Sequence, residues 1–207
     1  MERLICLAVG YCFGLIQTSY IIGRIKGIDI RKKGSGNAGT TNAIRTMGWK
    51  NGLLTMAIDV MKCIAAVLIM RYVFRDSDIR LLLGLYTAAG VVLGHDFPFY
   101  LKFKGGKGIA ATAGMIIAFG DIRLIIAGIL CFFIPVLITR FVSLGSLCLS
   151  TSFLIGMIIV GQMGSYLMTQ DRLIEMYILT AVLTALAYWL HRSNIKRLAA
   201  GKENKLF

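Results

Sequence analysis

The chain has 207 residues, of which 57% are hydrophobic and only 16% are charged, and its mean hydropathy is +0.75. A water-soluble domain of this length needs a larger charged surface, so the composition excludes an ordinary soluble protein and indicates an integral membrane protein. The net charge of +13 is then no sign of nucleic-acid binding, because excess Lys and Arg usually set the orientation of a membrane protein.

Seven apolar segments are candidates for helices that cross the ~30 Å hydrocarbon layer. The first lacks a small-residue cleavage site and is expected to remain as a span. The fourth and fifth are short and are separated by a tight turn at 120–123, so they either cross fully or dip in and return, which leaves five spans as the alternative. We expect an all-α integral membrane protein with seven transmembrane helices in a single domain, residues 1–207. The segments cover residues 4–22, 53–73, 81–93, 109–119, 124–138, 144–162 and 176–189.

The distribution of basic residues predicts the orientation of these spans. Of the 23 Lys and Arg, 16 fall on one side, in the loops 24–50 and 94–108, at Arg140 and in the tail after the last span. Six fall on the other side, and Lys62 lies within the second span. Because cytoplasmic loops carry the excess of basic residues, the amino terminus is expected outside and the carboxyl terminus in the cytoplasm.

The segment between the first two apolar runs is cationic, rich in glycine and free of acidic residues from 30 to 58. Its glycines let backbone N–H groups turn toward one point, which forms an anion-binding concavity. Arg45 can hold a phosphate through two parallel hydrogen bonds. An ordinary solvated basic loop is the alternative, although such a loop would normally contain some acids. The candidate binding residues here are Ser35, Gly36, Asn37, Gly39, Thr40, Asn42 and Arg45.

A second glycine-rich segment, 94–108, carries three lysines. Lys107 stands between two glycines and can neutralise a phosphate, but the Ser or Thr that a magnesium-nucleotide loop requires after it is missing. Nucleotide binding is therefore not expected. His95 borders the membrane, and a structural histidine at a helix end is the alternative for it. The candidate binding residues here are His95, Lys102, Gly105, Gly106, Lys107 and Gly108.

Two further polar patches fall on the predicted cytoplasmic side. Ser143 and Ser146 open the sixth run, where free N–H groups and hydroxyls suit an anion, with a plain helix cap as the alternative. His191 and Asn194, three residues apart, are expected to share one face of a helix after the seventh run. Asp59 lies three residues before Lys62 within the second run, and mutual pairing best explains two charges there.

The cysteines and histidines do not form the pattern of a metal site. Five cysteines are scattered through apolar segments without a CxxC spacing, and they indicate small buried hydrophobic side chains. The two histidines are too few for a histidine-based cluster. No metal and no cofactor is expected.

Taken in order, four motifs resemble the bacterial membrane glycerol-3-phosphate acyltransferases that use acyl phosphate as donor, the PlsY family. The motifs are Ser35-x-Asn37-x-Gly39-x-x-Asn42-x-x-Arg45, Gly94-His95-x-x-Pro98 with Phe103-Lys-Gly-Gly-Lys107-Gly108, Ser143-x-x-Ser146, and His191-x-x-Asn194. Asp59-x-x-Lys62 also fits, although Cys63 follows where a glycine is expected. The resemblance covers nearly the whole chain.

This resemblance implies the transfer of a fatty acyl group from acyl phosphate to the 1-hydroxyl of glycerol 3-phosphate, which gives lysophosphatidic acid and phosphate. It implies an enzyme of the bacterial cytoplasmic membrane with its active site facing the cytoplasm and no cofactor. We also expect no nucleic-acid partner and function as a monomer. The residues expected at the acyl-phosphate end are Ser35, Asn37, Asn42, Lys107, Ser143 and Ser146, and those at the glycerol 3-phosphate end are Arg45, Lys107, His191 and Asn194. The catalytic set is Ser35, Arg45, Lys107, His191 and Asn194.

Two other functions are alternatives to this one. A transporter or flippase of an organic phosphate commonly shows inverted repeats and broken midplane helices, whereas the polar groups here gather on one side. A purely structural membrane protein leaves the clustering of cations, glycines and hydroxyls unexplained. The sequence therefore favours surface chemistry on phosphates.

Overall fold

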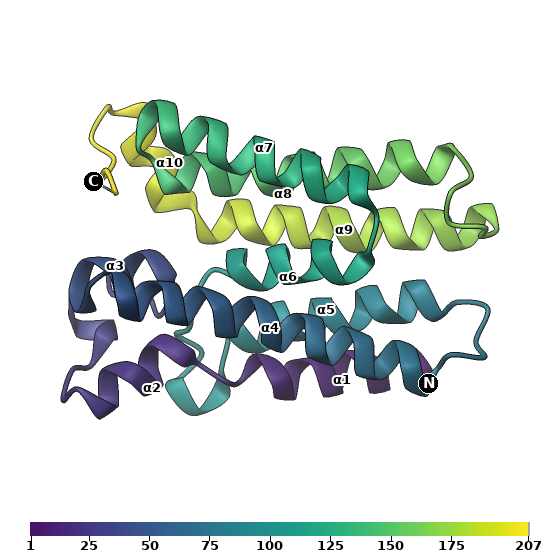
Figure 1. Cartoon of the computed structure of the whole chain (residues 1–207), viewed down its shortest axis with the longest axis horizontal. Helices are drawn as coiled ribbons and strands as arrows, with labels where there is room; N and C mark the ends of the chain where they lie inside the picture. The colour runs from purple at the N-terminus through teal and green to yellow at the C-terminus, as the bar shows by residue number, and fades with distance from the viewer. Residues whose placement is uncertain (207) are drawn as a thin grey trace. The chain divides into compact units, whose positions relative to one another are not determined.

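In the computed structural model, residues 1–206 are described, and within them the regular secondary structure is helical, with no strand. The helices group into two compact units, Met1–Ala118 and the part from Phe119 onward (Figure 1). The first unit holds α1 (Glu2–Gly14), α2 (Thr18–Ile25), α3 (Thr40–Met47), α4 (Trp49–Val73), α5 (Arg80–Asp96) and α6 (Ile109–Phe119), with the short 3₁₀ helices Ile30–Lys32 and Phe99–Leu101. The second holds α7 (Ile122–Thr139), α8 (Val142–Gln162), α9 (Gln170–Leu190) and α10 (Arg192–Ala199).

Helices α1 and α5 cross closely because each carries two glycines four residues apart at the contact. A Cβ atom on Gly10 would collide with the carbonyl oxygen of Thr87, and a Cβ atom on Gly94 would collide with that of Tyr11. Small residues at this spacing let two helix backbones approach in an apolar environment, where tight packing is the main attraction. Gly10 meets Gly90 and Gly14 meets Gly94, so the two helices run in the same direction.

The predicted first span is interrupted, which corrects the expectation of one continuous helix over residues 4–22. Helix α1 ends at Gly14, and α2 begins at Thr18. The fully buried Gln17 occupies the break, and its Nε2 donates to the carbonyl oxygen of His95 (2.9 Å). The ammonium group of Lys62 donates to the carbonyl of Ile16 (2.6 Å). Non-helical backbone at this depth is tolerated because protein groups satisfy its carbonyls.

The other contacts of the first unit fix the directions of its long helices. Lys62 of α4 meets His95 of α5, whereas Arg71 packs against Gly84, so these two helices are antiparallel. Helix α6 runs along the second half of α4, because a Cβ on Gly114 would collide with the carbonyl of Val60, and Arg71 Nη1 donates to the carbonyl of Ala118 (2.8 Å).

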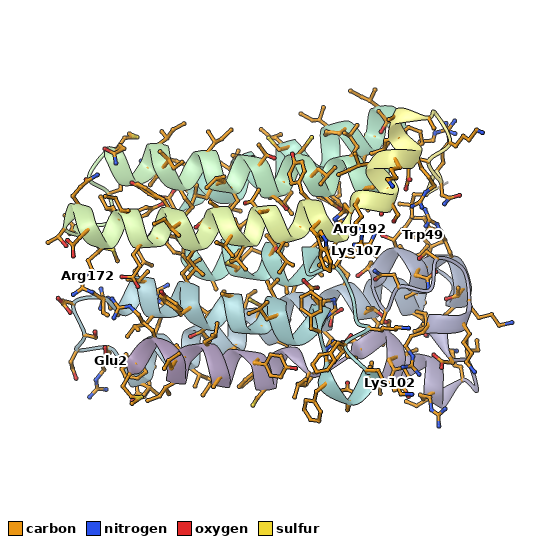
Figure 2. The ribbon with its side chains drawn as sticks, turned by 180° about the vertical axis from the view of Figure 1, so that it is seen from behind. Glu2, Trp49, Lys102, Lys107, Arg172 and Arg192 are labelled. Atoms are coloured by element: carbon orange, nitrogen blue, oxygen red, sulfur yellow. The ribbon has the colours of Figure 1, made fainter. Side chains whose placement is uncertain are left out.

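The second unit is an up-and-down arrangement of α7, α8 and α9, drawn in green to yellow in Figure 1. Gly145 packs on Phe132 near the end of α7, and Gly156 packs on Leu124 near its beginning. Thr184 Oγ1 of α9 donates to the carbonyl of Ser150 on α8 (3.3 Å). The short helix α10 follows α9 directly, at the end marked by Arg192 in Figure 2 and opposite to Arg172.

Six helical segments within residues 1–206 are long and apolar enough to cross a membrane: Glu2–Ile25, Trp49–Val73, Arg80–Leu101, Ile122–Thr139, Val142–Gln162 and Gln170–Leu190. The expected all-helical class is confirmed. The fourth expected segment, Ile109–Phe119, is a helix with the predicted bounds but is shorter than these six. Helix α4 starts four residues before the predicted start of the second span, and α9 starts six residues before that of the seventh. The single domain stays a prediction.

Candidate functional site

The glycine-rich loop before α3 is built around the side chain of Asn42. Its Oδ1 accepts the backbone N–H of Ser35 (2.9 Å), and its Nδ2 faces the carbonyl oxygens of Ile30 (3.1 Å), Lys33 (3.0 Å) and Asn37 (3.0 Å). Asn42 is 2% exposed, and its side chain stabilises the surrounding loop through these hydrogen bonds. A contribution of Asn42 to binding is therefore indirect, through the positions of Ser35 and Asn37.

At two positions of this loop the backbone conformation explains why the residue is glycine. Gly34 and Gly36 adopt φ values of 56° and 71°, which lie in the left-handed region that side chains disfavour. A Cβ on Gly34 would also collide with Asn42 Oδ1. The tight turn leaves Ser35 exposed between the two glycines.

Helix α3 carries the remaining predicted residues of this segment. Gly39 is its N-cap in extended conformation, and Thr40 begins its first turn. The Oγ1 atom of Thr40 is buried and has no hydrogen-bond partner among residues 1–206. Arg45 lies exposed in the last turn. The sequence placed these residues in a loop, whereas the structure gives a two-turn helix whose free N–H groups lie next to the glycine loop.

Residues 102–108, the loop of the second glycine-rich segment, are held against the end of α5 by backbone hydrogen bonds. The N–H of Gly106 donates to the carbonyl of His95 (2.9 Å), and the N–H of Gly105 donates to that of Asp96 (3.1 Å). The N–H of Ala38 donates to the carbonyl of Gly105 (3.3 Å) and so joins the two glycine-rich loops. The structure thus brings both predicted phosphate-binding loops of the first unit together.

The predicted residues Lys102 and Lys107 of this loop and His95 at the end of α5 differ in their exposure. Lys102 is exposed in left-handed conformation (φ 56°), at the end of the first unit that also carries Trp49 and lies opposite to Glu2 (Figure 2). Lys107 is half-buried, and the adjacent Gly108 has a φ of 70°. His95 is 3% exposed, with its ring against Gly106.

Near the first loop, Asp29 and Arg31 form a two-pronged ion pair. Arg31 Nε donates to Oδ1 (3.0 Å) and Nη2 donates to Oδ2 (2.9 Å) of Asp29, and the N–H of Arg31 adds a third bond (3.1 Å). The guanidinium lowers the pKa of Asp29 to about 2. One cation of the segment is thus already paired by the acid just before it.

The serines of the second unit occupy the first turns of α8. Ser146 Oγ donates to the carbonyl of Val142 (2.8 Å), as serines commonly do within helices. Ser143 Oγ is buried without a hydrogen-bond partner in the described part of the chain. The two hydroxyls thus differ, because Ser146 uses its proton within the helix and Ser143 does not.

His191 lies at the junction of two helices, as the C-cap of α9 and the N-cap of α10, and Asn194 lies in the first turn of α10. The N–H of Ile195 donates to the carbonyl of His191 (2.8 Å), so His191 and Asn194 belong to one helical turn. His191 Nδ1 lies 2.8 Å from the carbonyl of Ala187, and because a carbonyl only accepts, Nδ1 carries the proton. Asn194 Nδ2 donates to Oε1 of Glu203 (2.8 Å), whose Oε2 accepts from Arg197 (2.8 Å).

Sequence reasoning missed several polar side chains that hold these segments. Glu203 lies in a tail whose sequence is mainly basic, and Gln17 and Thr18 lie within a mainly apolar segment. The adjacent polar residues Gln17 and Thr18 within an otherwise apolar segment are the sequence feature that could have indicated their structural role. Among residues 1–206, no three His, Cys, Asp or Glu side chains gather as a metal site.

Comparison with known proteins identifies the family. The glycerol-3-phosphate acyltransferase family model matches residues 4–201. The chain is 40% identical to a glycerol-3-phosphate acyltransferase of Clostridioides difficile, over 98% of this chain and 95% of that protein. It is 37% identical to one of Chlorobaculum parvum, with coverage of 97% and 94%.

The same result comes from solved structures. The crystal structure of PlsY, an integral membrane glycerol 3-phosphate acyltransferase, in its glycerol 3-phosphate form matches with a TM-score of 0.84 and 32% identity, over 99% of this chain and 96% of that one. Its lysophosphatidic acid form matches with a TM-score of 0.80, 30% identity, and coverage of 99% and 95%. The chain therefore belongs to the glycerol-3-phosphate acyltransferase (PlsY) family and is a multi-pass integral membrane acyltransferase of lipid biosynthesis.

Proposed function

We propose that this enzyme transfers a fatty acyl group from acyl phosphate to the 1-hydroxyl of glycerol 3-phosphate and releases lysophosphatidic acid and phosphate. The observation that carries the proposal is the pair of glycine-rich, cationic loops joined by the Ala38–Gly105 hydrogen bond. Two such loops suit a reaction in which each substrate carries a phosphate. The solved forms of PlsY with glycerol 3-phosphate and with lysophosphatidic acid support this acceptor and this product.

The proposed work of the residues is to hold two anions and stabilise developing charge. Acyl phosphate is already an activated anhydride, so the reaction needs no covalent enzyme intermediate. The acceptor oxygen attacks the carbonyl carbon, the bond from that carbon to the phosphate oxygen breaks, and phosphate departs with the electron pair. Lys107 and Arg45 supply positive charge to the phosphates, and neutralisation of a departing phosphate lowers the barrier.

The hydroxyl proton goes to a phosphate oxygen of a substrate in the reaction we favour. His191 is the alternative acceptor, since its Nδ1 donates to Ala187 and its Nε2 therefore has the lone pair in the neutral ring. We assign Ser35, Asn37, Ser143 and Ser146 to the acyl-phosphate end on the strength of the sequence motifs. His191 and Asn194 are assigned to glycerol 3-phosphate on the same ground.

We further propose seven crossings, with the amino terminus outside and the tail in the cytoplasm of a bacterial cell, as a monomer. The 11 residues of α6 extend only ~16 Å as a helix, about half of the hydrocarbon thickness. However, α6 runs beside α4 as far as Arg71, near the end of α4. The parallel α1 and α5, with an antiparallel α4 between them in the chain, agree with alternating crossings.

The reaction is tested with purified protein, acyl phosphate and glycerol 3-phosphate, by following phosphate release and the acylated product. Release should require both substrates, and acyl thioesters should not replace acyl phosphate. Arg45→Ala and Lys107→Ala should each lower the rate by about 10- to 100-fold, because each removes a charge-assisted contact. Lys50→Ala, a change of an exposed lysine at the start of α4, is the control and should leave the rate unchanged.

Mass spectrometry separates direct transfer from a covalent route. With acyl phosphate alone, direct transfer leaves the enzyme unmodified. A stable acyl adduct on Ser35, or product formation from acyl thioesters at a similar rate, would disprove the proposed chemistry.

A further inference from the structure

A buried cluster of side chains around Lys62 lies next to the loop that carries Lys107, because His95 of this cluster contacts Gly106 of the loop. The Lys62 ammonium group has three short contacts: the carbonyl of Ile16 (2.6 Å), Oδ1 of Asp59 (2.8 Å) and Nδ1 of His95 (3.0 Å). Asp59 Oδ1 also accepts from Thr18 Oγ1 (2.9 Å). The side chains of Lys62 and Asp59 are 3% and 1% exposed. The expected pairing of Asp59 with Lys62 is confirmed, and the pair is part of a larger assembly.

The contacts of Lys62 determine where His95 carries its proton. An ammonium group has three N–H donors and no acceptor, so its three shortest contacts use these donors, while the carbonyl of Gly14 lies farther away at 3.4 Å. Nδ1 of His95 must then accept, so the proton of the neutral ring is on Nε2. The helix break between α1 and α2 contributes to this arrangement, because the Ile16 carbonyl has left the helix ladder and is available to Lys62.

His95 connects this cluster to the glycine-rich loop in two ways. Its carbonyl oxygen accepts the N–H of Gly106 and also the Nε2–H of Gln17. Its ring occupies the space where a Cβ on Gly106 would stand, so the ring and the loop are in direct contact. Rotation or displacement of the ring would therefore move Gly106, the residue that precedes Lys107.

A second buried acid lies beside this contact. Both carboxylate oxygens of Asp96 lack a hydrogen-bond partner among residues 1–206, and Gly108 packs over them. Asp96 therefore contacts the same glycine-rich loop as His95.

We propose that Lys62 and Asp59, acting through His95, are positioning residues for Lys107. They hold the imidazole in one orientation and one tautomer, and the imidazole holds loop 102–108 in the conformation that presents Lys107 to a substrate phosphate. The proposal rests on the function proposed above for Lys107. Lys62 contacts no substrate in this arrangement.

The tautomer of His95 can be measured without any enzymatic activity. The chain has two histidines, so His191→Gln leaves His95 as the source of the imidazole signals. In ¹⁵N spectra of the detergent-solubilised, ¹⁵N-histidine-labelled protein, Nε2 should show the protonated resonance and Nδ1 the unprotonated one. A protonated Nδ1 would overturn the proposal, whether or not the protein uses acyl phosphate.

Kinetics test the connection to Lys107. Lys62→Met is combined with Asp59→Asn, so that neither member of this ion pair is left as an unpaired charge. This pair of changes should lower kcat by about 10- to 100-fold, since displacements of about 1 Å cost rates of this size. Added to Lys107→Ala, it should cause little further loss, because both act on the same group. Independent, multiplying losses would refute the proposed connection.

Two controls separate positioning from general stability. Cys63→Ala alters a fully buried neighbour of Lys62 outside the cluster and should leave kcat unchanged even where thermal stability falls. His95→Asn keeps an oxygen that can accept from Lys62 and should retain more activity than His95→Leu. Equal loss in both His95 variants would contradict the role given to Lys62. Failure of the unmodified protein to use acyl phosphate would instead refute the proposed reaction.

Discussion

Replacement of Asn42 by alanine should open the glycine-rich loop before α3. The change removes the acceptor of the Ser35 N–H and the donors to the carbonyls of Ile30, Lys33 and Asn37. The amide nitrogen has two N–H donors for these three carbonyls, so the side chain supplies three hydrogen bonds in all. At about 1 kcal/mol net for each bond, the loop loses roughly 3 kcal/mol of local stability. Because 1.4 kcal/mol corresponds to a factor of ten, opening becomes up to ~10²-fold more frequent.

Hydrogen exchange measures this opening at amides that do not bond to Asn42 itself. The N–H of Gly36 donates to Lys33 (3.0 Å), and that of Ala38 donates to Gly105 (3.3 Å). Both amides should exchange faster in Asn42→Ala by up to about two orders of magnitude. Acyl transfer should fall at least ~10-fold, because a mobile Ser35 no longer lies in the reactive geometry.

Asn51 offers a matched control in the same unit. Its Nδ2 makes a single bond, to the carbonyl of Met47 (2.6 Å), so Asn51→Ala should cost about 1 kcal/mol and leave the Gly36 and Ala38 amides protected. Unchanged exchange and full activity in Asn42→Ala would show that the loop does not depend on this side chain, and the reasoning would fail.

Three further predictions concern charge, metals and orientation. The Arg31 guanidinium lowers the pKa of Asp29 from 3.8 to about 2, so the stabilisation by this pair should be complete above about pH 4 and lost as pH falls through about 2. A ¹³C titration of the Asp29 carboxyl group measures it, and a midpoint near 3.8 would contradict it. Activity should survive a chelator, and specific restoration by a divalent ion would show that the site was misread. A reporter active only outside the cell should give no signal when fused after Arg192, and a strong signal would reverse the proposed orientation.

Hydropathy was sufficient to locate the helices because a bilayer constrains length and composition together. The segments predicted at 109–119 and 144–162 correspond to α6, with identical bounds, and α8, which starts two residues earlier. The starts of α4 and α9 were missed because polar residues such as Lys50 and Asp171 continue the helices beyond their apolar parts. Helical hydrogen bonding does not stop where the apolar composition ends.

The interruption near Gly14 could not be predicted from local pattern. The polar pair Gln17 and Thr18 lies at this place but does not by itself specify a break. The break is stabilised by partners far along the chain, namely Lys62 and the backbone of His95. The motif spacing did locate the glycine-rich loops, but it gave Asn42 the same role as Ser35. Only the contacts show that Asn42 bonds the loop while Ser35 is exposed.

The two histidines show how neighbouring donors and acceptors, and not residue type, determine the available chemistry. At His95 a lysine donates to Nδ1, so Nε2 carries the proton and the ring can donate but cannot accept there. At His191 a carbonyl accepts from Nδ1, so Nε2 has the lone pair and can take a proton. If a histidine takes the hydroxyl proton in place of a phosphate oxygen, it must therefore be His191. Loss of activity in His191→Gln with retention in His191→Ala plus added imidazole would indicate that histidine route.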